Sequence, residues 1–206
     1  KITMSQPVLF LRNVNIYQEK NLILSNVNIE VKHGEFLYII GKTGSGKSSF
    51  MKTLYADLPL TEGQGSIVDY DLATLKEKNI PYLRRKIGIV FQDFKLLKDR
   101  NIYDNVAFVL EVLNTPSKEI KRRVNDALSD VGLLHRRKSM PSEISGVEKQ
   151  RVAIARAMVN EPSLILADEP TGNLDPETSM EIVEILKKIN QKGTALLFAT
   201  HNYDIV

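Results

Sequence analysis

The sequence predicts an α/β fold built on a parallel sheet, and two observations lead to this prediction. Four short segments, at 36–40, 87–91, 164–167 and 195–199, are apolar almost throughout, as expected of strands buried on both faces of a parallel sheet. Segments with helical patterns lie between them. Short buried strands that alternate with helices favour a parallel sheet covered by helices.

The N-terminal third of the chain has a different pattern, which predicts β structure with one exposed face. Residues 8–17 form one apolar-rich segment. In the next segment Val27, Ile29 and Val31 alternate with polar residues. A period of two is typical of a half-buried strand.

The helices are predicted from their first residues and from periodicity. Asp175 followed by proline supplies an N-cap and a favourable first helical residue, and Thr115 followed by Pro116 opens another helix in the same way. The helix after Asp175 has apolar residues at i, i+3, i+4 and i+7, namely Ile182, Ile185, Leu186 and Ile189. The stretch from about 93 to 160 has no strong strand, so a helical subdomain is expected there.

The composition is that of a globular chain without a membrane span. With 28 basic and 25 acidic residues among 206, the net charge of +3 does not argue for a nucleic-acid-binding protein. No run approaches the roughly 20 apolar residues that cross a bilayer, and Lys1 to Pro7 lack the apolar stretch of a signal peptide. Cysteine is absent, which excludes disulfides and thiolate metal sites. Any membrane role is expected to go through a partner.

Residues 41–48 match the phosphate-loop pattern G-x-x-x-x-G-K-[ST], between the apolar segment 36–40 and a helix predicted over 48–58. Glycines let the backbone turn with positive φ, so that successive N–H groups face an anion at a helix N-terminus. Lys47 is expected to reach the β- and γ-phosphates of a nucleoside triphosphate, and the Ser48 hydroxyl to bind Mg²⁺. A ligand-free glycine-rich turn is the alternative. The predicted nucleotide-binding residues of this segment are Gly41, Lys42, Thr43, Gly44, Ser45, Gly46, Lys47, Ser48 and Ser49.

A pair of acids ends the apolar segment 164–167. Ligands of open α/β sheets bind at the carboxyl ends of strands, which is where Asp168 and Glu169 are expected. Asp168 is placed to hold Mg²⁺ through water, and Glu169 to polarise a water for attack on the γ-phosphate. The alternative is a solvated acidic loop before the turn at Pro170.

The order of these features resembles that of the ATP-binding-cassette (ABC) ATPases. Gln92 after a strand, Ser145-Gly146, the acids Asp168-Glu169 and His201 after a buried strand follow the phosphate loop in that order. The resemblance covers essentially the whole chain.

The resemblance implies one nucleotide-binding domain over 1–206. Its core, with a parallel sheet and an N-terminal antiparallel β subdomain, is expected at about 1–92 and 161–206, and its inserted α-helical subdomain at about 93–160.

The same resemblance assigns roles to single residues. It makes Glu169, His201 and Gln92 the catalytic residues, and Ser48, Gln92 and Asp168 the residues around Mg²⁺. Tyr17 would stack on adenine, unless it is an ordinary sheet-edge tyrosine. Ser145, Gly146 and Asp175 would contact nucleotide bound mainly by a second copy, which implies a homodimer with two shared ATP sites.

The signature segment departs from the family pattern, Leu-Ser-Gly-Gly-Gln, because Val147 and Glu148 stand where glycine and glutamine are usual. Ser145 and Glu148 also match a capping box, so a structural role is compatible with an anion-binding one. The Val147 side chain either blocks close approach or points away and leaves its N–H available.

A narrower resemblance connects the segments 91–97 and 105–108 with the cell-division members of the family. It implies an integral membrane partner, peripheral attachment at the cytoplasmic face of the bacterial inner membrane, ATP and Mg²⁺ as ligands and no nucleic acid. Phe94, Leu96 and Leu97 would help to form the docking surface, unless they pack inside the helical subdomain. The alternatives are a lipoprotein-release or macrolide-export ATPase, a soluble ABC ATPase acting on DNA or the ribosome, and a nucleotide-gated module with little hydrolysis.

Overall fold

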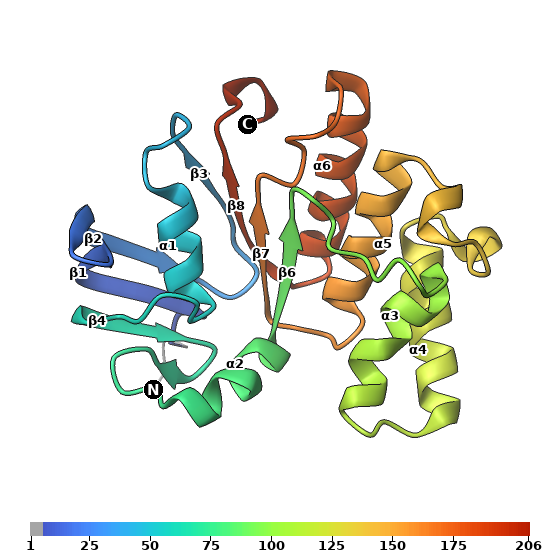
Figure 1. Ribbon diagram of the computed structural model, residues 1–206, viewed down its shortest axis with the longest axis horizontal. Coiled ribbons are helices and arrows are strands. Elements are labelled where there is room, and N and C mark those ends of the chain that lie inside the picture. Colours follow the sequence, from blue (N-terminus) through green and yellow to red (C-terminus); the bar gives the residue numbers. More distant parts are fainter. Residues whose placement is uncertain (1–5) are drawn as a thin grey trace.

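The computed structural model describes residues 6–206 and contains two sheets, with helices between and beside them (Figure 1). The first sheet is antiparallel and has the order β2-β1-β4-β5, with β1 at Leu9–Gln18, β2 at Asn21–Val31, β4 at Glu62–Ile67 and β5 at Tyr70–Asp71. The second is parallel and has the order β3-β8-β7-β6, with β3 at Phe36–Ile40, β6 at Ile87–Phe91, β7 at Leu164–Asp168 and β8 at Ala195–Thr200. The predicted α/β class and the β character of the N-terminal third are confirmed. Residues 1–5, most of the stretch searched for a signal peptide, lie outside the described part.

Helix α1 lies between the two sheets, whereas α5 and α6 cover the other face of the parallel sheet, and α3 and α4 lie beyond α5 (Figure 1). The helices have these bounds: α1 Lys47–Leu54, α2 Ile80–Lys86, α3 Ile102–Val112, α4 Ser117–Asp130, α5 Gly146–Met158 and α6 Pro176–Gln191. Short 3₁₀ turns occur at Glu77–Asn79, Leu134–Arg136, Pro141–Glu143 and Tyr203–Ile205. None of the helices within residues 6–206 is both long and apolar enough to cross a membrane.

The parallel sheet separates two apolar clusters, because successive side chains of a strand point to opposite faces. In β7, Ile165 packs with α3 to α6, while Leu164 and Leu166 pack with α1 and the antiparallel sheet. Strands β7 and β8 are buried on both faces, as their apolar runs predict. This burial fixes the carboxyl ends of the two strands side by side, where polar residues follow.

Strand β3 is less buried than its apolar run predicts. Its residues are partly exposed, and Ile40 is 37% exposed. The reason is position, since β3 is an edge strand with β8 as its neighbour. The strand at the opposite edge, β6, packs against α5 and is mostly buried.

Two predicted helix ends differ from the structure. The helix predicted over 48–58 ends at Leu54, because Ala56 adopts a left-handed φ of 62° and the next two amides donate back to the Lys52 carbonyl. The helix predicted to have Thr115 as its N-cap begins one residue later, with Pro116 in the cap position. The Thr115 amide instead donates to the Leu110 carbonyl and so satisfies a carbonyl group at the C-terminal end of α3.

Candidate nucleotide site

The phosphate loop connects β3 to α1 and turns through glycines in the left-handed region. Gly44 has φ 82° and Gly46 has φ 97°, values that side chains rarely adopt. A Cβ on Gly46 would also lie 2.9 Å from the Leu24 Cγ of β2, so the loop and the antiparallel sheet meet closely there. Gly46 is the N-cap of α1, which directs the N-terminal N–H groups of that helix toward the loop.

Lys47 is held inside this loop by oxygen atoms. Its ammonium donates to the carbonyls of Gly41 and Lys42, the latter at 2.9 Å, and to the Ser45 hydroxyl at 3.3 Å. The same nitrogen lies 4.0 Å from the Glu169 Oε1. A fixed cation next to helix N–H groups is the arrangement that binds a chain of phosphates.

The acids at the end of β7 have different surroundings. Burial, and secondly the charge of Glu169, raise the pKa of Asp168, while the lysines Lys47, Lys52 and Lys95 oppose the rise. Glu169 has a left-handed φ of 47°, and its amide donates to the Ala199 carbonyl at 2.8 Å. Its Oε2 lies 3.0 Å from the Nδ1 of His201. The backbone turn therefore directs Glu169 toward both Lys47 and His201.

These groups line one pocket of about 490 Å³. The predicted residues around it are Thr43, Gly44, Gly46, Lys47, Ser48, Ser49, Gln92, Asp168, Glu169 and His201. A cation, helix N–H groups and a histidine-linked carboxylate thus share one cavity. Such a cavity can bind a polyphosphate and activate a water next to it.

Two of the pocket's lining residues, Gln18 at the end of β1 and Ile23 near the start of β2, lie next to the β1–β2 turn and were not predicted. Nothing in the sequence indicates them, since only the fold brings this turn to the phosphate loop. Tyr17 does not line the pocket. Its hydroxyl donates to the Glu62 carboxylate, with oxygen distances of 3.2 and 3.3 Å, so adenine stacking stays a prediction.

Ser145 and Gly146 lie at the N-terminus of α5 and are not among the residues that line the pocket. The predicted capping box is confirmed: the Ser145 hydroxyl accepts from the Glu148 amide at 3.3 Å, and Glu148 accepts from the Ser145 amide at 3.1 Å. The hydrogen bond that the Ser145 amide donates to the Glu148 carboxylate is the main cause that lowers the pKa of Glu148, which also pairs with Arg136 at 3.5 Å. Val147 is partly buried against the core, so its side chain is directed inward.

Asp175 is the N-cap of α6, where its carboxylate accepts from the Thr178 amide at 2.9 Å. This hydrogen bond lowers the pKa of Asp175. Like Ser145 and Gly146, it is absent from the lining of the pocket. The residues assigned to a shared site are therefore exposed at helix N-termini outside the pocket of their own chain.

Mg²⁺ fits the oxygen donors of the pocket. It takes hard oxygen ligands, and proteins often hold it with one or two carboxylates together with substrate phosphates. The Ser48 hydroxyl and the partly buried Asp168 carboxylate supply such oxygens. In the described part of the chain, no three acidic or histidine side chains converge as a metal cage. The donor set therefore suits a cation bound jointly with phosphates.

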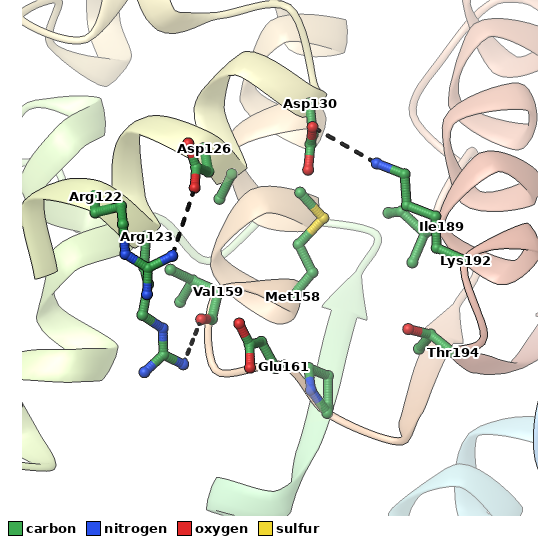
Figure 2. A pocket seen from close by; sticks show the side chains of 12 residues that line it. Arg122, Arg123, Asp126, Asp130, Met158, Val159, Glu161, Ile189, Lys192 and Thr194 are labelled. Carbon is green, nitrogen blue, oxygen red and sulfur yellow. Dashed lines mark hydrogen bonds and ion pairs between the residues drawn. The ribbon is translucent and has the colours of Figure 1, made fainter. Parts of the chain in front are cut away.

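A second hollow, of about 240 Å³, lies between α4, the end of α5 and the end of α6 (Figure 2). Most of the charged groups around it are engaged with protein partners. Arg122 lies 3.9 Å from Asp126, Lys192 lies 3.7 Å from Asp130, and the Arg123 guanidinium donates to the Val159 carbonyl at 2.9 Å. The contacts of Lys192 and Arg123 join α4 to the ends of α6 and α5, whereas Arg122 and Asp126 both belong to α4, so the hollow has a structural explanation.

Comparison with known proteins adds a family to this geometry. Residues 24–172 match the family model described as ABC transporter. The chain is similar to the cell division ATP-binding protein FtsE of Streptococcus pneumoniae serotype 2, with 47% identity over 193 residues that cover 94% of this chain and 84% of that protein. It is also similar to FtsE of Bacillus subtilis, with 50% identity over 183 residues that cover 89% of this chain and 80% of that protein.

A solved structure agrees with the fold. The dimeric structure of the ATP-binding cassette MJ0796, in a post-hydrolysis state bound to ADP and Pi, superimposes with a TM-score of 0.83 and 34% identity. The match covers 96% of this chain and 89% of that one.

Proposed function

Since the chain belongs to the ABC transporter family, we propose that it is the ATP-hydrolysing subunit of a membrane-associated complex that acts in bacterial cell division. ATP binding and hydrolysis follow from the family and from its likeness to a cassette solved with ADP and Pi. The convergence of Lys47, Glu169 and His201 on one cavity is the observation that carries the proposal.

The reaction needs positioning and charge neutralisation more than covalent chemistry. Lys47, fixed by loop carbonyls, binds the terminal phosphates and neutralises their charge. Glu169 orients the attacking water and accepts its proton, while His201 beside it donates to the γ-phosphate. Asp168 and the Ser48 hydroxyl would hold Mg²⁺, with Gln92 nearby, and the bound ion supplies positive charge at the phosphates.

Two copies of the chain are proposed to share two ATP sites. Ser145, Gly146 and Asp175 do not line the chain's own pocket, yet all three stand at helix N-termini, which favour anions. A homodimer would bring these ends to the nucleotide of the opposite subunit. The dimeric form of the similar cassette MJ0796 supports this arrangement.

The membrane partner is proposed to be an FtsX-like integral membrane subunit, which would hold the ATPase at the cytoplasmic face of the inner membrane. Closure of the dimer would pull on that subunit and activate cell-wall hydrolases outside the cell. The proposed docking surface is a groove of about 570 Å³ that Phe94, Leu96 and Lys98 line together with Pro141. Leu97 beside it is 38% exposed, while Leu96 is partly buried against the core. An apolar surface rimmed by charge suits a partner helix.

Single-turnover hydrolysis of ATP by the purified chain tests the enzymatic part. Glu169→Gln keeps the shape of the side chain but removes the base, and should slow hydrolysis by about 100-fold or more while ATP still binds. Asn160→Ala, which alters an amide that donates to the Arg85 carbonyl, is the matched control and should hydrolyse normally. Equal rates for Glu169→Gln and the unmodified chain would contradict the proposed role.

Co-purification from membranes tests the cellular part. Recovery of an FtsX-like subunit, and its loss when Leu97 is changed to aspartate, would support the assignment. Recovery of a lipoprotein-release or macrolide-export permease instead would overturn the cell-division role and leave the ATPase role intact. No hydrolysis with or without the partner would favour a nucleotide-gated module.

A further inference from the structure

Two side-chain amides join the segment after β6 to the segment after β7. The Gln92 Nε2 donates to the Asn173 Oδ1 at 3.1 Å, and the Asn173 Nδ2 donates to the Gln92 backbone carbonyl at 3.0 Å. Gln92 lines the nucleotide pocket, whereas Asn173 does not. The reciprocal pair therefore fixes both the side chain and the backbone of a pocket residue from outside the pocket.

Gly172 allows this contact by its lack of a side chain. A Cβ at this position would lie 2.6 Å from the Cδ and 2.7 Å from the Nε2 of Gln92, closer than van der Waals contact allows. The Gln92 amide thus lies directly on the Gly172 backbone. Glycine is needed at position 172 so that the Gln92 amide can lie close to the backbone. The side chain of the next residue, Asn173, is then within hydrogen-bonding distance of that amide.

The backbone on either side of this pair is held by α5. The fully buried Gln150 donates through its Nε2 to the carbonyls of Phe91, at 2.9 Å, and Pro170, at 2.5 Å. Arg156, two turns further along α5, donates to the Phe94 carbonyl at 2.7 Å. Because α5 holds both backbone segments, the hydrogen bonds between Gln92 and Asn173 determine the orientation of the Gln92 side chain.

We propose that Asn173 is a positioning residue for Gln92, and that it holds the Gln92 amide in the orientation used for ATP hydrolysis. The inference deepens the proposed function and rests on it. Asn173 lies two residues before Asp175, which is assigned to the opposite subunit's site. The amide pair therefore connects the pocket of one subunit to the segment that reaches its partner's nucleotide.

Kinetics of Asn173→Ala, measured on the full chain, tests the positioning role. Loss of a residue that orients a pocket side chain from outside the pocket, as Asn173 does for Gln92, should lower kcat by about 10-fold or more. ATP affinity, measured in the presence of EDTA, should stay within about twofold, because the Lys47 contacts are unchanged. If Asn173 acts through Gln92, Asn173→Ala should add no further loss in a Gln92→Ala background. Additive losses in the double variant, or lost ATP binding in Asn173→Ala, would overturn the proposal.

NMR of the side-chain amides supplies a readout that does not depend on activity. The Gln92 side-chain NH₂ signal, assigned through its disappearance in Gln92→Ala, should shift in Asn173→Ala and stay in place in the matched control Asn160→Ala. An unmoved signal in Asn173→Ala would show that the amide pair does not form. Failure of the proposed function looks different, since the unmodified chain would then hydrolyse no ATP, or Glu169→Gln would hydrolyse it as fast as the unmodified chain, whatever the residue at position 173.

Discussion

Val147 stands where the ABC family usually has glycine, and the structure gives a definite expectation for Val147→Gly. Val147 is the second residue of α5, and its side chain packs against the apolar cluster shared by the parallel sheet and the surrounding helices. An inward side chain leaves the outer face of the helix N-terminus open. Replacement by glycine should therefore remove packing without opening a new path to a phosphate.

The expected loss of unfolding free energy in Val147→Gly has two parts. Full burial of a valine side chain stabilises a protein by about 1.5–3 kcal/mol, and a partly buried one contributes about half of that. Glycine lowers helix stability by roughly a further 0.3–0.5 kcal/mol relative to valine. The unfolding free energy should fall by about 1–2 kcal/mol, which for a chain of this length lowers Tm by roughly 2–8 °C.

Thermal denaturation and steady-state ATP turnover, measured on the same preparations, test this expectation. Turnover should change by less than about threefold, because Ser145, Gly146 and their N–H groups keep their positions. Val112→Gly is the matched control, since Val112 is 47% exposed at the end of α3 and its loss removes little packing. A rise in turnover of many tens of fold would refute the reasoning and show that Val147 blocks the site.

Three further predictions use positions whose surroundings differ. Gly146→Ala should change the unfolding free energy by less than about 0.5 kcal/mol, because its Cβ would lie no nearer than 3.8 Å to another residue. If the partner's nucleotide approaches this residue, the same change should lower turnover about tenfold. Denaturation and steady-state kinetics of the same variant test both expectations. Gly88→Ala should lower the unfolding free energy by about 1–3 kcal/mol and Tm by roughly 2–12 °C, because its Cβ would clash with the Ala157 carbonyl oxygen, and unchanged melting would contradict that contact. Asp168→Asn should abolish turnover but raise Tm at pH 7. The raised pKa of Asp168 means that its favourable contribution is present at acid pH and is lost as pH rises through the folded-state pKa, so the gain in Tm should shrink on acidification.

The parts of the fold that follow from local sequence could be predicted. Apolar runs mark β7 and β8 because both faces of these strands are covered, so every position must be apolar. The same rule overestimates the burial of β3, because an apolar run does not distinguish an edge strand from a central one. Strand order is set by contacts between segments far apart in the chain, and those contacts are not encoded in any one run.

The candidate site shows the same division. The phosphate loop and the acids after β7 could be found, because their chemistry requires particular residue types at short spacing. The partners of Gln92 could not, since Asn173 is 81 residues away and the contact depends on the absence of a side chain at Gly172. The role of Gln150 was also hidden, because its hydrogen bonds to Phe91 and Pro170 exist only once both loops lie beside α5.

Helix α5 explains why a departure at Val147 is compatible with an intact site. Gln150 and Arg156 attach the segment after β6 to this helix, and they hold Phe94 in a left-handed φ of 64°, which is unfavourable without such support. A shift of α5 must then displace the loop that carries Gln92. The site requires α5 to be held in the correct position, and Val147 contributes to this because its side chain packs against the core. The N-terminus of α5 can therefore be capped by Ser145 and also bind the phosphate of a nucleotide held by a partner subunit, as proposed, because both roles depend on a fixed position of this helix end.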